Sequence, residues 1–421
     1  MEDGALNAVN PHYLERVMAA SAHREIETCE DVYTQSGVKL LSKGARISHE
    51  VKDKLAIHKL RKPLENCLAV KSGMDKAHLT RTIERVLDQN TALHPLIGKG
   101  SLSRSITALP LNPPTLAMLS VAESHGAEGL DHYLLVALLS LGLGYKLQLG
   151  ENDMQVLASA GLLHDVGELY IDQRYLDTSR VLTPEEWRHL SVHPVVGFRL
   201  ATEICGFSSK VGEAILHHHE RGEGGGYPSG ITQAKLALPA RIVGTAEMVA
   251  SLANFSEYPL ERAEVAARIV PGEYDRELIS VLSRALGDAR NGKFGVQHIL
   301  PTEQIQALLK AIARALGLFE QYEAASPQHG SPSQKLLERA FTRFKLIIRA
   351  YSSTGLDIQD SSNPLDTDAS DWMFAEIDMI LHEIRWRLRE LARDIALRSS
   401  QISADEAQYF QPLVEMLHAR I

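Results

Sequence analysis

The sequence contains few cysteines, and their positions do not indicate a common role. Cys29, Cys67 and Cys205 lie far apart and show no Cys-x-x-Cys spacing. This pattern argues against a disulfide framework and against a zinc site built on thiolates. Free thiols in a reducing compartment are the simpler interpretation. We therefore expect a cytoplasmic protein without structural disulfides.

Long apolar runs and an excess of basic residues are also missing. The most apolar stretch, residues 134–143, is too short to cross a bilayer and predicts a buried helix. The N-terminus lacks the basic start and apolar run of a signal peptide. The formal net charge of -9 gives no general basic surface for a nucleic-acid polymer. We expect neither a membrane nor a nucleic-acid polymer as partner, and a small anionic ligand would need positive charge supplied locally, for example by bound metal ions.

The chain of 421 residues is long enough for two to three domains. Apolar residues recur at spacings of three and four through most of it, which predicts a mainly α protein. A hairpin signal around Ser36-Gly37 is the chief β-type feature. The predicted order is a small N-terminal α/β module (1–72), a helical connection (73–114), a helical domain (115–322), a linker (323–335) and a C-terminal helical hairpin or bundle (336–421).

The C-terminal region carries apolar stripes that allow two interpretations. Phe341, Phe344 and Ile347 follow one helical face, and Ile384 and Leu388 follow another. Such stripes can form the core of a helical bundle or a surface for a partner or a second copy of the chain. A homodimer through these helices is therefore one of the predicted partners.

Histidines and carboxylates cluster at the ends of predicted helices. His164 and Asp165 follow the apolar run SAGLL, and burying both side chains is costly unless a cation compensates. A helix C-cap with an exposed histidine and aspartate is the alternative for this pair alone. A second cluster, HHHE at 217–220, ends another helix before a glycine-rich run, and His193 lies between the two clusters. Neutral imidazoles suit divalent iron, manganese, nickel or zinc, so the three clusters together predict a metal site.

Four blocks of the sequence carry a family resemblance: GLLHDVGE, HPVVG, HHERGEGGGYPSG and ARIVGTAE. In order and spacing they resemble the HD-GYP family of cyclic di-GMP phosphodiesterases, a branch of the HD superfamily, over about residues 130–286. The resemblance implies a helical bundle with two or three divalent metal ions, iron or manganese before zinc or nickel. It also implies a cyclic dinucleotide as substrate, with cyclic di-GMP first.

The resemblance also implies roles for individual residues. The metal ligands carried over by position are His132, His164, Asp165, His193, His218, His219, Glu247 and Glu128. Asp165 would bridge two ions, and with His164 would be central to catalysis through a metal-bridging hydroxide that attacks phosphorus. For Glu128, an exposed carboxylate at a helix start is the alternative, and His217 is expected behind the ligands or in solvent. Gly226, Tyr227 and Pro228 would lie against the substrate or bind a signalling partner, unless they are a simple turn with a packed tyrosine.

The match fails in the part expected to bind substrate. The family motif HDxGK reads HDVGE, so Glu168 stands where a lysine is expected to meet a phosphate. Arg174, Arg180 and Arg262 are candidates to replace the lost positive charge, although surface arginines are the simpler interpretation. Two functions therefore remain open: an active phosphodiesterase with altered recognition, and a catalytically weak or inactive module that binds metal and a ligand or partner. A phosphomonoesterase is less well supported, because the Gly-Tyr-Pro loop is specific to the narrower family.

Overall fold

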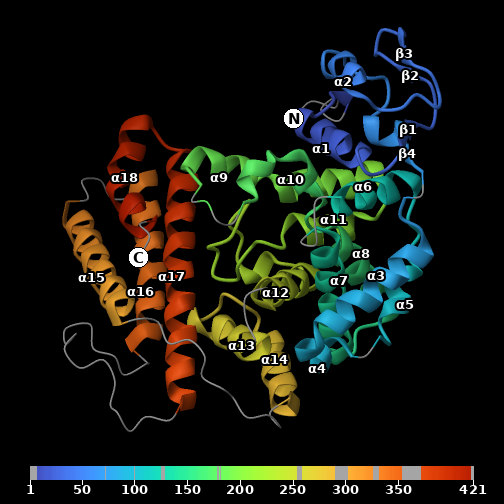
Figure 1. Ribbon diagram of the computed structural model, residues 1–421. Helices are drawn as coiled ribbons and strands as arrows, with labels where there is room; N and C mark the ends of the chain where they lie inside the picture. Colours follow the sequence, from blue (N-terminus) through green and yellow to red (C-terminus); the bar gives the residue numbers. More distant parts are fainter. Residues whose placement is uncertain are drawn as a thin grey trace. The chain divides into compact units, whose positions relative to one another are not determined.

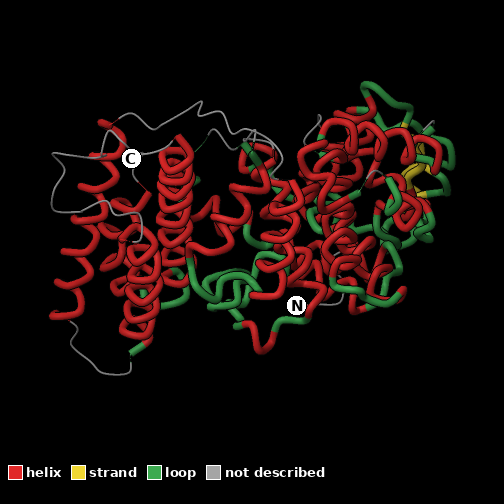
Figure 2. Tube along the Cα trace, turned by 90° about the horizontal axis from the view of Figure 1, so that it is seen from below, coloured by secondary structure: helices red, strands yellow, loops and turns green. Residues whose placement is uncertain are grey.

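A computed structural model shows a mainly α protein, as the sequence predicts. It describes residues 7–71, 73–98, 100–124, 129–177, 180, 182–253, 258–289, 302–325, 331–352 and 371–418. Figure 2 shows helices as nearly all of the regular structure, with a few short strands. The chain divides into two compact units. The first comprises Met1–Arg180, His189–His219 and Leu236–Glu257, and the second Val181–Arg188, Glu220–Lys235 and Tyr258–Ile421.

The N-terminal part of the first unit combines short helices with two small sheets. Its elements are α1 (Pro11–Ser21), β1 (Ile26–Thr28), β2 (Val32–Tyr33), β3 (Lys39–Leu41), α2 (His49–Ala56), η2 (Leu64–Cys67) and β4 (Leu68–Val70). Strand β2 pairs antiparallel with β3 across the hairpin predicted at Ser36-Gly37, and β1 pairs antiparallel with β4. Gly37 has a φ of 89°, which a glycine adopts without a steric penalty. Asn10 caps α1 by accepting hydrogen bonds from His12 and Tyr13.

The helices that follow form the core around the candidate site. They are α3 (Lys76–Gln89), η3 (Thr91–Leu93), α4 (His94–Ile97), α5 (Ser103–Thr107), α6 (Pro113–Glu123), α7 (Leu130–Lys146), α8 (Glu151–Leu163), η4 (Val166–Tyr170) and η5 (Gln173–Tyr175). Helix α7 is buried from Tyr133 to Gly144, which explains its apolar sequence. Gly161 of α8 lies so close to Ala137 of α7 that a Cβ at residue 161 would sit 2.7 Å from the Ala137 Cα. Small residues thus bring these two helices together.

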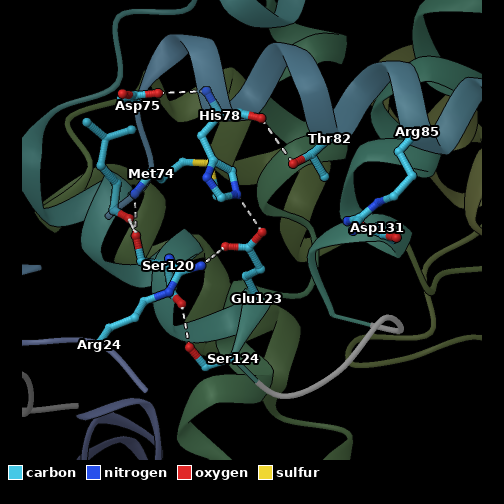
Figure 3. A network of polar contacts seen from close by, with 11 residues as sticks. Arg24, Met74, Asp75, His78, Thr82, Arg85, Ser120, Glu123, Ser124 and Asp131 are labelled. Atoms are coloured by element: carbon cyan, nitrogen blue, oxygen red, sulfur yellow. Dashed lines mark hydrogen bonds and ion pairs between the residues drawn. The ribbon is translucent and has the colours of Figure 1, made fainter. Parts of the chain in front are cut away.

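A polar network ties α3 to α6 and to the N-terminal part (Figure 3). Glu123 of α6 accepts from Nε2 of His78 at 2.7 Å and is ion-paired with Arg24. Ser120 accepts a hydrogen bond from the backbone N–H of Met74 at 2.8 Å. Burial acts to raise the pKa of Glu123, but His78 and Arg24 outweigh it and the net shift is downward. The carboxylate is therefore held in its charged form by the hydrogen bond from His78 and by the Arg24 guanidinium.

Five further elements follow along the chain: α9 (Pro184–Leu190), α10 (His193–Arg199), the π-helical turn η6 (Leu200–Ile204), α11 (Ser209–Leu216) and α12 (Leu238–Ala253). Helix α9 crosses the boundary between the two units. Helices α8, α11 and α12 pack on one another, and α12 also packs on α7. The ends of α8 and α11, the start of α10 and the interior of α12 carry histidines and carboxylates singled out in the sequence.

The second unit is helical in its described part. Its elements are η7 (Gln233–Lys235), α13 (Pro259–Ile269), α14 (Arg276–Ala289), α15 (Thr302–Ala325), α16 (Pro332–Ser352), α17 (Asp371–Ser399) and α18 (Ala404–His418). Figure 1 shows α15 to α18 side by side as a bundle. The predicted stripes form its core: Phe344 and Ile347 of α16 and Ile384 and Leu388 of α17 are buried. Core packing therefore accounts for these stripes, and the homodimer stays a prediction.

Candidate metal centre

The structure brings seven of the predicted ligands together from the ends and faces of separate helices. His132 lies in the first turn of α7, His164 and Asp165 follow α8, His193 begins α10, His218 and His219 follow α11, and Glu247 lies within α12. Glu128, the eighth predicted ligand, lies outside the described residues. All seven belong to the first compact unit.

Asp165 stands at the middle of the cluster. Its Oδ1 lies 3.2 Å from Nε2 of His193 and 3.3 Å from Nε2 of His218. Its Oδ2 lies 3.0 Å from Nε2 of His164 and 3.8 Å from Nε2 of His132. The two carboxylate oxygens therefore face two different sets of imidazoles, as a carboxylate shared between two ions would have to.

Glu247 completes the second of these sets. Its Oε2 lies 2.8 Å from Nε2 of His132 and 3.2 Å from Nε2 of His164. Its Oε1 accepts a hydrogen bond of 2.8 Å from the Ser251 hydroxyl, which fixes the carboxylate. The glutamate thus has the reach to serve at a position where the family usually has aspartate.

Two groups of four residues meet the geometric requirements of a divalent site. One is Asp165, His193, His218 and His219, and the other is His132, His164, Asp165 and Glu247. In each group the candidate ligand atoms all lie within 4.8 Å of one another. Asp165 belongs to both. Imidazole and carboxylate ligands in this combination suit divalent iron, manganese, nickel or zinc.

Three histidines are oriented by hydrogen bonds from the ring nitrogen that faces away from the cluster. In each case Nδ1 bonds a backbone carbonyl three residues earlier, and a carbonyl can only accept, so Nδ1 carries the hydrogen. The pairs are His164 with Gly161 at 2.8 Å, His193 with Leu190 at 2.9 Å and His218 with Ile215 at 2.6 Å. This leaves Nε2 of each ring available as a metal ligand, with its direction set by the helix end.

The histidines and carboxylates of the cluster strongly shift one another's pKa values. Burial acts to lower the pKa of His164, but Asp165 and Glu247 outweigh it and the net shift is well upward. Burial acts to raise the pKa of Asp165, but His164, His193 and His218 outweigh it and the net shift is well downward. Nε2 of His164, Oδ1 of Asp165 and Oε2 of Glu247 are buried, and among the described residues none of these atoms has an aligned hydrogen bond. Such buried atoms fit divalent cations, which would satisfy both carboxylates and imidazoles.

Close packing and one hydrogen bond hold Asp165 against its neighbours. A Cβ on Gly167 would overlap the carbonyl oxygen of His193, so the glycine lets η4 approach α10. The Tyr133 hydroxyl donates a hydrogen bond of 2.8 Å to the carbonyl of Asp165. Tyr133 was not predicted as a site residue, since an aromatic residue in an apolar helix is most simply interpreted as a residue of the hydrophobic core.

A cavity of about 520 Å³ opens beside the cluster. Its lining includes the candidate ligand His132 and also Glu168, Arg174 and Arg16. Burial raises the pKa of Glu168 to about 7, and the neighbouring Asp165 carboxylate adds to the shift. Helix α8 ends at Leu163, so Glu168 lies in the 3-10 helix η4 and not in a continuation of α8. Its side chain nevertheless lines this cavity. Arg16 comes from α1, and its part in the cavity was not predicted from the sequence.

The predicted substrate loop belongs to the second unit and is bound there by the C-terminal helices. Arg343 of α16 donates to the carbonyl of Gly225, and Arg398 of α17 donates to the carbonyl of Gly226, each at 3.1 Å. The ring of Tyr227 packs edge-on against Trp187 with centroids 5.4 Å apart. The peptide bond from Tyr227 to Pro228 is cis.

The carboxylate of Glu220 anchors the same loop from its start. It accepts backbone hydrogen bonds from Ser229, Gly230 and Ile231 at 2.6, 2.9 and 3.1 Å. Three backbone donors on one carboxylate fix the turn. Glu220 belongs to the HHHE cluster noted in the sequence, but its role as the anchor of this loop was not predicted. That role depends on the folded conformation of the loop, which the motif does not indicate.

The arginines considered as replacements for the missing lysine have different surroundings. Arg174 lines the cavity but pairs with Asp172, and its side chain is 76% exposed. Arg180 donates to the carbonyl of Arg174, and Arg262 pairs with Glu383 in the second unit. His217 follows α11 and is half-buried, and it belongs to neither group of candidate ligands.

Comparison with known proteins agrees with the resemblance seen in the sequence. Residues 113–262 match the HD domain family. The chain is 29% identical over 160 residues to cyclic di-GMP phosphodiesterase PA4108 of Pseudomonas aeruginosa, covering 37% of this chain and 39% of that protein. It is 31% identical over 153 residues to a cyclic di-GMP phosphodiesterase of Thermotoga maritima, covering 35% and 41%. It is 28% identical over 160 residues to 3'3'-cGAMP-specific phosphodiesterase 3 of Vibrio cholerae, covering 37% and 35%.

These matches confirm the recognition of an HD domain and of its similarity to cyclic-dinucleotide phosphodiesterases. The chain spans less than half the length of each of these relatives. In the described part of the chain, no helix is long and apolar enough to cross a membrane.

Proposed function

We propose that this chain is a metal-dependent phosphodiesterase that hydrolyses a cyclic dinucleotide, with cyclic di-GMP as the first candidate and 3'3'-cGAMP as the second. The observation that carries the proposal is the pair of four-residue groups that share Asp165. The cavity of about 520 Å³ beside them has the volume of a small-molecule site. The relatives named as phosphodiesterases of these two dinucleotides support the choice of substrate.

In this proposal the ligands are His132, His164, Asp165, His193, His218, His219 and Glu247, with Glu128 as a further candidate. Two or three divalent ions, iron or manganese before zinc or nickel, would supply a hydroxide nucleophile at neutral pH and offset the charge of the phosphoryl oxygens. The protein's own contribution is to orient the imidazoles through backbone carbonyls and to keep the ligands out of bulk water.

The test is turnover of cyclic di-GMP and 3'3'-cGAMP by full-length protein purified without oxygen, with its metal content measured. We expect a linear dinucleotide or mononucleotide product from the wild type. Asp165→Asn serves as the matched control, because it keeps the shape of the side chain and removes the charge that both groups share. If metal-loaded wild type releases product no faster than Asp165→Asn, the enzyme proposal is wrong.

The alternative function is a catalytically weak module that binds metal and a ligand and signals through its C-terminal helices. It is favoured by the bonds from Arg343 and Arg398 to the carbonyls of Gly225 and Gly226, which couple the loop to α16 and α17. Under this alternative, cyclic di-GMP would change hydrogen exchange in residues 220–235 and in both helices without turnover. A signalling partner that binds the Gly226-Tyr227-Pro228 loop also remains a proposal, and such a partner would compete with these arginines.

A further inference from the structure

Arg16 is a buried cation on the wall of the cavity. It lies on α1 of the N-terminal part, it is 5% exposed, and it lines the cavity together with His132 and Glu168. Its Nη2 donates to the carbonyl of Glu168 at 3.3 Å, and its Nε is buried without a hydrogen bond to any described residue. The guanidinium therefore keeps part of its donor capacity unused at the edge of the candidate site.

No carboxylate in the described part of the chain lies within ion-pair distance of Arg16. Burial of an unpaired cation is costly, and an anion bound in the cavity would repay that cost. Arg174, the other arginine of the lining, is exposed and already paired with Asp172. Arg16 is therefore a buried positive charge of this wall with no ion pair among the described residues, although the carboxylates of Glu168 and Asp172 lie near enough to act on its pKa.

Packing holds Arg16 in place. One turn before it on α1, the ring of Tyr13 stacks on Tyr170 of η4 with centroids 5.1 Å apart. The hydroxyl of Tyr170 in turn donates to Glu65, which is buried. A guanidinium whose helix is fixed in this way needs little ordering when it binds a ligand, and its planar fork matches two oxygens of a phosphate.

We propose that Arg16 binds a non-bridging phosphate oxygen of the cyclic dinucleotide, so that the N-terminal part of the chain completes the substrate site of the HD domain. The inference rests on the proposed function. Arg16 binds and positions the substrate in this assignment, and it holds no metal. Its loss should weaken substrate binding and leave metal content and the chemical step nearly unchanged.

The test compares full-length wild type with Arg16→Met, Arg16→Lys and a matched control, Arg24→Met. Arg24 belongs to the same N-terminal part and binds the core through Glu123, but it does not line the cavity (Figure 3). For each protein, metal content, thermal unfolding and the kcat and KM for cyclic di-GMP are measured at one salt concentration. We expect Arg16→Met to raise KM at least tenfold with kcat within threefold, Arg16→Lys to restore part of the affinity, and Arg24→Met to keep the wild-type KM.

Four results would overturn the assignment. A folded Arg16→Met protein with a KM within twofold of wild type shows that Arg16 does not meet the substrate. An equal rise of KM in Arg24→Met shows that the effect comes from loosened packing of the N-terminal part. If Arg16→Met does not fold, Arg16→Lys decides. Lysine keeps the charge but loses the planar fork, so the assignment requires a raised KM in Arg16→Lys, and a wild-type KM in that variant overturns it. Metal-loaded wild type that neither binds nor hydrolyses a cyclic dinucleotide instead overturns the proposed function, and this assignment with it.

Discussion

Replacing Glu168 by lysine should strengthen the binding of cyclic di-GMP. Glu168 lines a cavity of about 520 Å³. A sphere of that volume is about 10 Å across, so a phosphate inside it lies roughly 5–10 Å from the carboxylate, where each pair of unit charges is worth about 2 kcal/mol at an effective dielectric of about 20. The carboxylate therefore opposes an anionic ligand whenever it is ionised.

The pKa of about 7 for Glu168 sets the size of this opposition. At pH 7 the side chain carries on average about half a negative charge, so Glu168→Gln removes about half a charge and Glu168→Lys changes about one and a half. We expect affinity to rise about fivefold in Glu168→Gln and at least tenfold in Glu168→Lys, the latter being about 1.4 kcal/mol or more. Glutamine is the matched control, because it keeps the shape of the side chain and removes only the charge.

The assay is a calorimetric titration of the three metal-free proteins with a hydrolysis-resistant phosphorothioate analogue of cyclic di-GMP, at one salt concentration. Because burial raises the pKa of Glu168, its carboxyl group is mostly neutral below pH 6 and mostly ionised above pH 8. The advantage of Glu168→Gln over wild type should accordingly vanish at pH 6 and be greatest at pH 8. Equal or weaker binding by Glu168→Lys would refute the placement of this side chain beside the phosphates, and an advantage that does not depend on pH would refute its raised pKa.

Three further predictions concern the metal centre and its packing. Asp165→Ala should lose bound metal and fall below a tenth of wild-type turnover with an unchanged circular dichroism spectrum, because both ligand groups share this carboxylate. Elemental analysis and product formation check this prediction, and surviving activity would exclude the shared role of Asp165. Gly167→Ala should lower the free energy of unfolding by about 2–3 kcal/mol in urea titrations, because its Cβ would overlap the His193 carbonyl. Gly287→Ala is the control, because Gly287 is exposed within α14 and its added Cβ meets nothing within 4 Å, so it should not destabilise the protein. In the metal-free protein the pKa of His164 is raised by Asp165 and Glu247, so metal binding at pH 7 should release protons, and metal affinity should fall as the pH falls to 6. Calorimetry of metal binding in two buffers of different ionisation enthalpy checks this, and identical heats in the two buffers would contradict it.

The pattern of residues alone pointed to His164, Asp165, His193 and the run 217–219 as metal-ligand candidates, and the reason is local. His164 with Asp165 and the run from His217 to His219 occupy helix ends, so neighbours in the sequence reach the same point in space. The apolar run at 134–143 likewise predicted a buried helix, because a helix that is apolar on every face can only be interior. His132 and Glu247 needed the family resemblance, since a lone histidine or glutamate on a helix carries no signal of its own. The roles of all these ligands remain proposals.

What surrounds the cluster was decided by the tertiary structure. The sharing of Asp165 between two groups depends on the directions of four imidazoles from four segments, and periodicity does not encode those directions. Arg343 and Arg398 belong to no motif in the sequence, yet they bind the backbone of the Gly-Tyr-Pro loop more than a hundred residues earlier. Arg16 bonds a residue 152 positions away, and it does so because α1 packs on η4 through Tyr13 and Tyr170. Contacts of this kind arise from the packing of whole elements, and a single sequence contains no local pattern from which they could be inferred.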